Sequence, residues 1–263
     1  MAFSVVVLGS GSSGNATLLS HSKGKVLLDA GLSGREICRR ATSLGVYPES
    51  IKAIVVTHEH KDHTQGIRVL AKKFRVPVYI SDPTLEVLGI TQDLPARERI
   101  ESGREFCVAG MTFMPFAVPH DSVDPLGFVV SACGQKLGVA MDLGYVSALV
   151  RERLFGCDGL IIESNHDLEM LKIGPYPWAL KQRVMSRQGH LSNEAVAKFL
   201  TEDFDGRARY IFLAHLSKNN NHPDLARLAA GRALRSRHAT STGFPYCLRL
   251  TYQERPGDVM QLD

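Results

Sequence analysis

The chain contains 263 residues, of which 44% are hydrophobic and 22% are charged. This length is enough for one large α/β domain with a substantial core, and the composition excludes a disordered or low-complexity protein. The formal net charge of +4 is compatible with an anionic substrate, but it is too small to indicate nucleic-acid binding by itself.

The cysteines and the N-terminal residues indicate the compartment. Five cysteines are scattered without a CxxC pair, which favours reduced thiols in a cytoplasmic protein over a disulfide framework or a zinc ribbon. Residues 1–8 lack a basic region, and their apolar run is too short for a signal peptide or a membrane span. We therefore expect a cytoplasmic protein without membrane contact, in which residues 5–8 form the first strand. The oligomeric state stays open.

Residues 9–15, with the sequence GSGSSGN, form a loop of small residues after this strand. Such a loop lets backbone N–H groups and hydroxyls approach an anion closely, as in phosphate-binding loops. A plain glycine-rich turn is an equally good interpretation of these residues alone. The candidate substrate contacts in this loop are Ser10, Ser12, Ser13 and Asn15.

The next segments predict a strand, a turn and a helix. Residues 25–28 are apolar enough for a strand, which would end at an Asp-Ala-Gly turn over residues 29–31. Residues 33–44 predict a helix that carries Arg39 and Arg40, and we expect both arginines on a face exposed to water.

The stretch HEHKDH, residues 58–63, lies where a strand is predicted to pass into a helix. Residues 53–57 before it are β-branched and apolar, as in a buried strand. After it, apolar positions recur with helical spacing over residues 67–74. Four polar side chains of metal-binding type therefore occupy the junction between two regular elements.

The spacing within this stretch indicates a metal site. Side chains two apart in an extended segment share a side, so His58 and His60 can converge on one ion. Asp62 and His63 lie at the turn into the helix and can face a second ion. Imidazole and carboxylate together suit zinc, manganese or iron, and a pair of such ions suits the hydrolysis of a phosphate ester.

With Thr57 before it, the stretch resembles the signature THxHxDH of the metallo-β-lactamase fold superfamily. The resemblance implies a four-layer αβ/βα sandwich with a two-metal site at the edges of its sheets. It also implies that the first two histidines bind one ion and that the aspartate and the last histidine bind the other. In this superfamily the aspartate of the earlier strand-end turn, here Asp29, forms hydrogen bonds near the metal loop.

Three later strand ends match the remaining ligand motifs of the superfamily, because predicted strands end shortly before His120, Asp142 and His215. The resemblance implies that His120 completes the first ion and that His215 completes the second. Asp142 would bridge the two ions together with a hydroxide, the expected nucleophile, although a turn role is the alternative for this aspartate. The resulting ligand set is His58, His60, Asp62, His63, His120, Asp142 and His215.

A buried strand is also predicted at residues 159–163, ending in Glu163. This segment resembles one in the tRNA 3′-processing branch of the superfamily, whose glutamate works with a histidine from a later Gly-His motif. Here that histidine is His190 in GHLSN, and we expect Glu163 to fix and charge its imidazole, which contacts the scissile phosphate or protonates the leaving oxygen. Helix capping by Glu163 and packing by His190 are the alternative. The expected catalytic group is Asp62, Glu163 and His190, and Ser192 is a further candidate substrate contact.

Residues 174–183 mix aromatic and basic side chains in a loop that could stack a base and neutralise a phosphate, or could be a surface loop pinned by Trp178. Together with ESNHD, GHLSN and SGSSGN, this segment makes nearly the whole chain resemble the YycJ/WalJ-type proteins of the superfamily. That resemblance implies a phosphodiesterase that uses two divalent ions (zinc, manganese or iron) and acts on nucleic acid as a 5′-to-3′ exonuclease on DNA.

The chain departs from larger nucleases of the superfamily in one respect. Asp142 and His215 are 73 residues apart, and predicted strands and helices already use this span. We therefore expect a single domain over residues 1–263 without a β-CASP insert. Two other functions stay open: hydrolysis of a small ester (a cyclic phosphodiester, a lactone or a thioester) and a regulatory role without turnover. The complete ligand set favours an enzyme.

Overall fold

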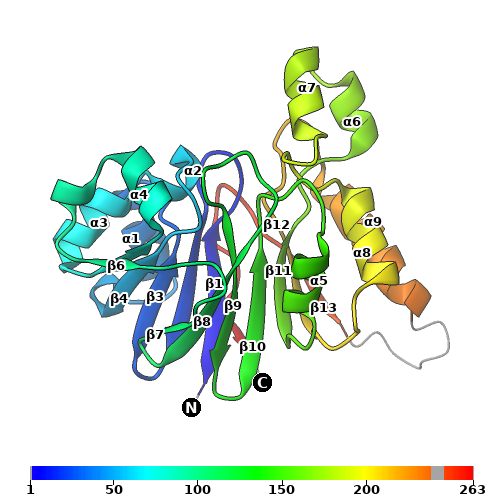
Figure 1. Ribbon diagram of the computed structural model, residues 1–263. Helices are drawn as coiled ribbons and strands as arrows, with labels where there is room; N and C mark the ends of the chain where they lie inside the picture. The colour runs from blue at the N-terminus through cyan, green and yellow to red at the C-terminus, as the bar shows by residue number, and fades with distance from the viewer. Residues whose placement is uncertain (1, 238–245, 263) are drawn as a thin grey trace.

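The computed structural model describes residues 2–237 and 246–262. Within them, two seven-stranded sheets pack face to face, and helices cover the outer face of each sheet (Figure 1). This is the four-layer αβ/βα sandwich that the sequence predicted. None of the helices in these residues is long and apolar enough to cross a membrane.

The first sheet contains the N-terminal strands and one strand from the C-terminus. Neighbours from β14 to β3 are antiparallel, and neighbours from β3 to β6 are parallel. Helices α1 (Gly34–Ser43), α3 (Ile67–Phe74) and α4 (Asp82–Leu88) pack on its outer face, with short 3₁₀ helices at Pro48–Ser50 and Thr91–Asp93. In spatial order the strands are β14 (Met260–Leu262), β1 (Phe3–Gly9), β2 (Ala16–His21), β3 (Gly24–Leu28), β4 (Ile51–Val55), β5 (Val78–Ile80) and β6 (Arg97–Arg99).

The second sheet is built in the same way from the rest of the chain. Neighbours from β7 to β10 are antiparallel, and neighbours from β10 to β13 are parallel. Helices α5 (Ala148–Leu154), α8 (Asn193–Glu202) and α9 (Pro223–Arg237) lie outside it. In spatial order the strands are β13 (Cys247–Leu250), β12 (Tyr210–Ala214), β11 (Gly159–Glu163), β10 (Gln135–Ala140), β9 (Leu126–Ala132), β8 (Met111–Ala117) and β7 (Phe106–Val108).

Three apolar clusters hold the layers together. The central cluster lies between the two sheets and includes Phe3, Phe113 and Phe128, none of which is exposed. The other two clusters lie between each sheet and its helices. Each large apolar side chain that is fully buried contributes about 1.5–3 kcal/mol, so these clusters fix the position of the strand ends that carry polar residues.

Polar residues gather where the parallel strands end, at the edge marked in Figure 1 by α2 (Lys61–Thr64), α6 (Leu168–Ile173) and α7 (Trp178–Val184). Asp142 and His215 follow β10 and β12 there, with φ angles of 53° and 56°. A left-handed backbone at a residue other than glycine costs about 1–3 kcal/mol, so surrounding contacts must hold it. These two turns bring Asp142 Oδ1 to 3.0 Å from His215 Nδ1.

The structure differs from the sequence prediction at several elements. Strands β2, β6, β9 and β14 and helices α5 and α6 add to the predicted set. Residues 174–183, expected as a loop, include most of helix α7. Arg40, expected to face water, is instead 5% exposed, because its Nη1 donates hydrogen bonds to the carbonyl oxygens of Leu8 (2.7 Å) and Gln253 (2.9 Å). The prediction of a solvated Arg40 was therefore wrong.

Candidate active site

Three histidines converge at the edge of the sheets. His58 and His60 lie between β4 and α2, His120 follows β8, and one nitrogen from each lies within 4.8 Å of the others. His58 Nδ1 is 2.9 Å from Thr57 Oγ1, and His120 Nδ1 is 3.2 Å from the carbonyl oxygen of Gly189. His120 Nε2 in turn lies 3.3 Å from His60 Nδ1. The donors that face the shared space are therefore Nε2 of His58, Nδ1 of His60 and Nε2 of His120.

A second group of donors lies beside the first. Asp62, His63 and His215 each bring one ligand atom within 4.8 Å of the others. A buried carboxylate holds each imidazole from behind, with Asp29 Oδ2 at 2.7 Å from His63 Nδ1 and Glu163 Oε1 at 2.9 Å from His215 Nδ1. A carboxylate on one ring nitrogen fixes the tautomer that offers the other nitrogen to a metal ion.

Asp142 lies between the two groups. Its carboxylate belongs to one group of possible metal ligands with His58 and His63, and to another group with His215. Asp142 Oδ2 is 3.0 Å from His63 Nε2 without hydrogen-bond geometry, and it has no hydrogen-bond partner among the described residues. The structure thus brings all seven predicted ligands together, with Asp142 at the centre.

Orphaned buried atoms show that this donor set fits metal ions. His58 Nε2, Asp142 Oδ2 and His215 Nε2 are buried and have no hydrogen-bond partner among the described residues. Leaving such atoms unsatisfied is costly, so buried groups of this kind call for an explanation, such as a bound ion. Imidazole nitrogens and carboxylate oxygens are ligands for divalent transition metals. The site is therefore built to hold divalent metal ions.

The charges in the site also favour a bound cation. Burial opposes protonation of His63, but the carboxylates of Asp29 and Asp142 outweigh it and raise the pKa of His63 to about 10. Burial, followed by the neighbouring His63, holds the pKa of His58 well below its ordinary value. The carboxylates of Asp29 and Asp142 thus favour positive charge at the second group, which a bound cation would supply.

Asp29 supports the metal loop as expected. Its Oδ1 accepts the Thr57 N–H at 2.8 Å, and its Oδ2 accepts the Thr57 hydroxyl at 2.9 Å in addition to facing His63. Asp29 is fully buried, and its φ of 59° turns the side chain under the loop. The predicted hydrogen-bonding position of Asp29 is confirmed.

The loop between β1 and β2 also contacts two of the predicted ligands. Ser10 Oγ accepts the His215 N–H at 2.7 Å, and Asn15 Nδ2 lies 2.9 Å from His63 Nε2. Ser10 and Asn15 are only 2% and 1% exposed, so a substrate cannot reach them. Ser12 lines the cavity in front of the ligands, and Ser13 is exposed. The expected contacts to substrate therefore depend on Ser12 and Ser13.

Glu163 is surrounded by hydrogen-bond donors. Its Oε1 lies 2.7 Å from His190 Nδ1, and its Oε2 accepts the N–H groups of Leu143 at 3.0 Å and Leu191 at 3.1 Å. Burial opposes the charged carboxylate, but His190 and the hydrogen bonds from the imidazoles outweigh it and lower the pKa of Glu163 to about 2. The structure therefore brings the expected pair of Glu163 and His190 together.

His190 faces the cavity, whereas Ser192 does not. The side chain of His190 is 22% exposed and lines the cavity, and its Nε2 forms no hydrogen bond with a described residue. Ser192 caps α8 by accepting the Ala195 N–H at 3.1 Å, and it is 8% exposed. The helix-capping role considered for Glu163 thus belongs to Ser192, which leaves little of this serine for substrate.

One wall of the cavity comes from α7, which stands beside the site in Figure 1. Arg183 on this helix forms an ion pair with Asp121, the residue after His120. Trp178 at the start of α7 is 63% exposed. Arg183 therefore lines the cavity beside the predicted ligands, and it lies on a helix instead of a loop.

Glu59, inside the stretch HEHKDH, has a role that the sequence did not predict. Its carboxylate accepts the Ser122 hydroxyl at 3.0 Å and the Val123 N–H at 2.9 Å. These bonds tie the loop that carries His120 to the loop that carries His58 and His60. The only sign of this role in the sequence was the position of Glu59 between the predicted ligands His58 and His60.

Comparisons with known proteins agree with this geometry. A family model described as "Beta-lactamase superfamily domain" matches residues 25–215. The chain is 37% identical over 231 residues to the exodeoxyribonuclease WalJ of Streptococcus pneumoniae serotype 2, with 86% of each chain covered. It is 35% identical over 233 residues to the exodeoxyribonuclease YycJ of Bacillus anthracis, with 87% of this chain and 88% of the relative covered. The metallo-β-lactamase fold protein YhfI of Bacillus subtilis shares the fold, with a TM-score of 0.73 and 14% identity over 99% of this chain and all of that one.

Proposed function

Because the chain belongs to the metallo-β-lactamase superfamily, and within it to the family of the exodeoxyribonucleases WalJ and YycJ, we propose that it is a metal-dependent exodeoxyribonuclease. The observation that carries this proposal is the pair of three-donor groups joined by Asp142, with Glu163 and His190 beside them. We further propose that it removes nucleotides in the 5′-to-3′ direction.

The proposed ligands follow the two donor groups. His58, His60 and His120 would hold one ion, Asp62, His63 and His215 would hold the other, and Asp142 would contribute to both. Zinc or manganese suits this mixture of imidazole and carboxylate, and iron is compatible with it. When bound, two such ions supply Lewis-acid chemistry: they make water nucleophilic near neutral pH and neutralise charge on a phosphodiester.

The remaining steps belong to protein side chains. Glu163 is too deeply buried to touch a substrate, so it acts as a positioning residue that holds the Nδ1 proton of His190. His190 then keeps Nε2 toward the cavity, where it can give a proton to the leaving oxygen of the cleaved phosphodiester. Asp62, whose side chain is 23% exposed, faces the same cavity as a ligand.

Nucleic-acid contact is supported by what surrounds the cavity. Ser12, at the tip of the glycine-rich loop, and Arg183, on α7, line the cavity, and α7 also carries the exposed ring of Trp178 at its start. Aromatic rings that stack bases, next to charges that neutralise phosphates, are typical of single-strand binding. A lactone or thioester does not need this combination.

The domain organisation and the cellular location of the enzyme are part of the proposal. We propose that residues 1–263 form a single domain without a β-CASP insert, which is supported by the regular elements between Asp142 and His215: α5, β11, α6, α7, α8 and β12. A cytoplasmic location is supported by five cysteines that are all free thiols.

Labelled nucleic acids test the proposal. Single- and double-stranded DNA and RNA, labelled at the 5′ or the 3′ end, would be incubated with added manganese and analysed on gels. We expect release of labelled mononucleotide from 5′-labelled DNA and a ladder from 3′-labelled DNA, both abolished by chelator and by His60→Ala. Robust turnover of a lactone or a thioester by the same preparation, with no cleavage of any labelled strand, would contradict the proposal in favour of a small-ester hydrolase.

A further inference from the structure

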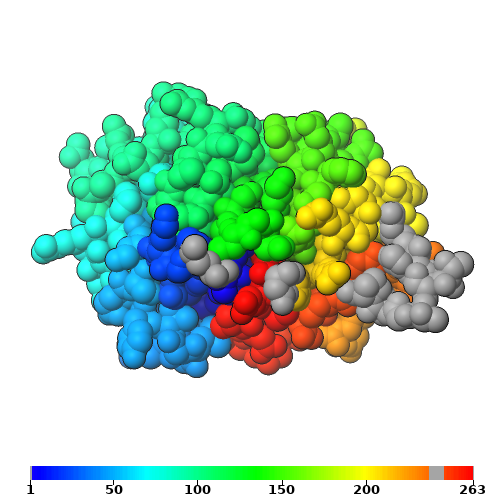
Figure 2. Space-filling view, turned by 90° about the horizontal axis from the view of Figure 1, so that it is seen from below, coloured from blue at the N-terminus to red at the C-terminus, as the bar shows by residue number. Residues whose placement is uncertain are grey.

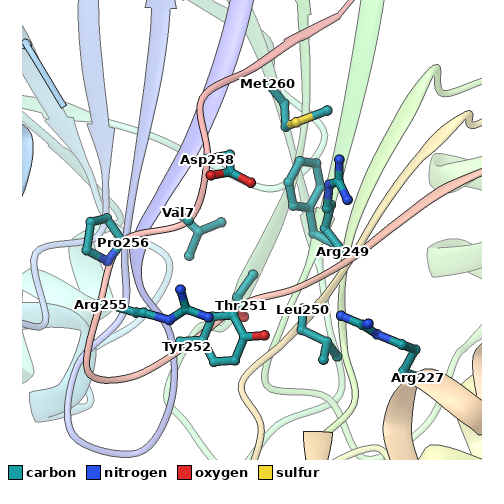
Figure 3. Close-up of a pocket in the computed structure, with 12 residues that line it drawn as sticks. Val7, Arg227, Arg249, Leu250, Thr251, Tyr252, Arg255, Pro256, Asp258 and Met260 are labelled. Carbon is teal, nitrogen blue, oxygen red and sulfur yellow. The ribbon is translucent and has the colours of Figure 1, made fainter. Parts of the chain in front are cut away.

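A second hollow lies away from the metal ligands, between β1 of the first sheet and β13 of the second. It is closed by α9 and by the segment after β13, and Figure 3 shows the side chains that line it. In Figure 2 the red C-terminal segment lies between the blue N-terminal part of the chain and the orange part that contains α9. None of the proposed metal ligands lines this hollow.

The hollow is rich in unpaired positive charge. Arg227, Arg249 and Arg255 line it, and Asp258 is the one carboxylate among its lining residues. An adjoining hollow shares Arg227 and Arg249 and adds Arg235, and none of the described residues that line it is acidic. None of the four arginines forms an ion pair with any residue in the described ranges 2–237 and 246–262. Arginines stay charged at every physiological pH, so four arginines beside a single carboxylate favour an anionic partner.

The shape of the first hollow suits phosphate groups more than a whole nucleotide. Its volume is about 160 Å³, whereas pockets that enclose a small molecule have roughly 300 Å³ or more. Figure 3 shows Arg227 reaching in from α9 on one side, and Arg255 lying on the Tyr252 ring on another, with its guanidinium carbon 4.1 Å from the ring centre. A guanidinium held in this way can bind phosphate oxygens with two parallel N–H donors.

Only one loop separates this hollow from the metal cavity. The Tyr252 carbonyl accepts the Ser10 N–H at 3.1 Å, and Gln253 Oε1 accepts the Ser13 N–H at 2.9 Å. Ser12, between these two serines, lines the metal cavity. A strand whose end is held at the metal ligands can therefore cross the tip of the glycine-rich loop and reach the arginines.

We propose that the two hollows, called here the arginine groove (Arg227, Arg235, Arg249 and Arg255), bind the phosphate backbone of the substrate strand several nucleotides from the cleaved end. This inference rests on the proposed function, because it concerns the same substrate. It implies that a long strand binds through contacts that a dinucleotide or a small phosphodiester cannot make.

Binding of a nuclease-resistant phosphorothioate strand to the metal-loaded protein, measured by fluorescence anisotropy across a salt series, tests the groove. In Arg227→Gln/Arg249→Gln, the slope of log affinity against log salt should fall in magnitude by about 1.4, since each phosphate contact to a single strand contributes about 0.7. Arg227→Lys/Arg249→Lys keeps both charges and should retain the wild-type slope. The matched control Arg97→Gln/Arg104→Gln removes two exposed guanidinium groups near the opposite edge of the first sheet and should leave the slope unchanged.

Steady-state kinetics distinguish a defect in the arginine groove from a defect in the active site. The glutamine pair should raise KM for long DNA but leave the turnover of bis(4-nitrophenyl) phosphate unchanged, because this small diester cannot reach the groove. The inference would be overturned if the glutamine pair kept the wild-type salt slope, or if the control pair lost as much slope as the glutamine pair. It would also be overturned if turnover of the small diester fell as much as turnover of long DNA, or if inorganic phosphate bound without any effect on strand binding. If the wild-type protein releases nucleotides and the glutamine pair behaves identically, the groove is rejected and the nuclease is retained. If the wild-type protein cleaves no strand, the nuclease is rejected, and the salt slope of binding still decides whether the groove exists.

Discussion

Glu163 is shared by two histidines that have different tasks. One carboxylate oxygen faces Nδ1 of both His190 and His215, at 2.7 and 2.9 Å, and the other oxygen is held by two backbone N–H groups. The same negative charge therefore orients a proposed metal ligand and a proposed proton donor. A bound divalent cation would lower the pKa of nearby imidazoles, and the Glu163 carboxylate opposes that effect.

Substituting Glu163 should affect both tasks together. In Glu163→Gln, metal affinity and turnover of labelled DNA should each fall by about 10–100-fold, the usual effect of losing a residue that holds a metal ligand. Competition with a chromophoric chelator measures the affinity, and single-turnover kinetics measure the cleavage. Glu194→Gln, at an exposed position on α8, is the matched control. Unchanged metal affinity in Glu163→Gln would show that His215 does not depend on this carboxylate.

His190 should affect catalysis without affecting the metal. His190→Ala should keep full metal content while turnover falls by about 10²–10⁴-fold, the range expected for a general acid or base. Elemental analysis and gel assays on the same preparation check this, with His222→Ala, whose side chain is 61% exposed, as the control. One ring nitrogen of His190 could also serve as a ligand with Asp142, Glu163 and His215. Loss of an ion from His190→Ala would therefore make it a ligand and end its proposed role as a proton donor.

Helix α1 is anchored to the sheet by a buried charge. Arg40 Nη1 bonds two backbone carbonyls from opposite ends of the chain, and its Nε donates to Glu36 at 2.6 Å. Arg39, one residue earlier, contacts the same glutamate, but its side chain is 62% exposed. These adjacent arginines therefore make a matched pair for measuring what burial adds.

Removing Arg40 should destabilise the fold far more than removing Arg39. Hydrogen bonds to charged groups contribute about 1.5–3 kcal/mol each, so Arg40→Met should lower the free energy of unfolding by about 3 kcal/mol. Arg39→Met should cost less than about 1 kcal/mol, the usual value for an exposed ion pair. Urea unfolding of both variants measures the difference. Equal losses would mean that the two carbonyl contacts contribute nothing.

Elements were predictable from sequence where a local pattern decides them. The helix at Ile67–Phe74 follows from its apolar spacing, and the strand before His58 follows from its β-branched run. Strand β2 has buried residues in succession without alternation, so no period marks it. The burial of Arg40 depends on Gln253, which is 213 positions away, and the bond from the His215 N–H to Ser10 spans 205 positions. Contacts over such distances in sequence leave no local signal.

The whole molecule is two similarly built halves with the site between them. Each sheet runs from antiparallel into parallel strands, and β3 and β10, where the change occurs, each lead into an Asp-X-Gly turn whose aspartate has a positive φ, Asp29 and Asp142. His58 and His63 come from the first half, and His120 and His215 come from the second. Ions held by both sets of ligands would link the two halves.

Removing metal should therefore lower the stability of the whole protein. An ion present at 100 times its dissociation constant contributes about 2.7 kcal/mol to the free energy of unfolding. At about 2–4 °C per kcal/mol for a domain of this size, chelation should lower Tm by about 5–10 °C for each ion that it removes. Calorimetry with and without chelator measures the shift, and Asp142→Ala should show little of it. A Tm that does not respond to chelator would contradict a metal site that joins the halves.

We propose that this site cleaves DNA ends with two bound ions. Metal-free protein would be titrated with manganese while bound metal and the release of nucleotides from labelled DNA are followed in the same samples. We predict that nucleotide release reaches its plateau at about two ions per chain, and that Asp142→Ala reaches neither the full occupancy nor the rate. Full nucleotide release from metal-free protein, or from Asp142→Ala at unchanged metal occupancy, would contradict cleavage that depends on two bound ions and Asp142.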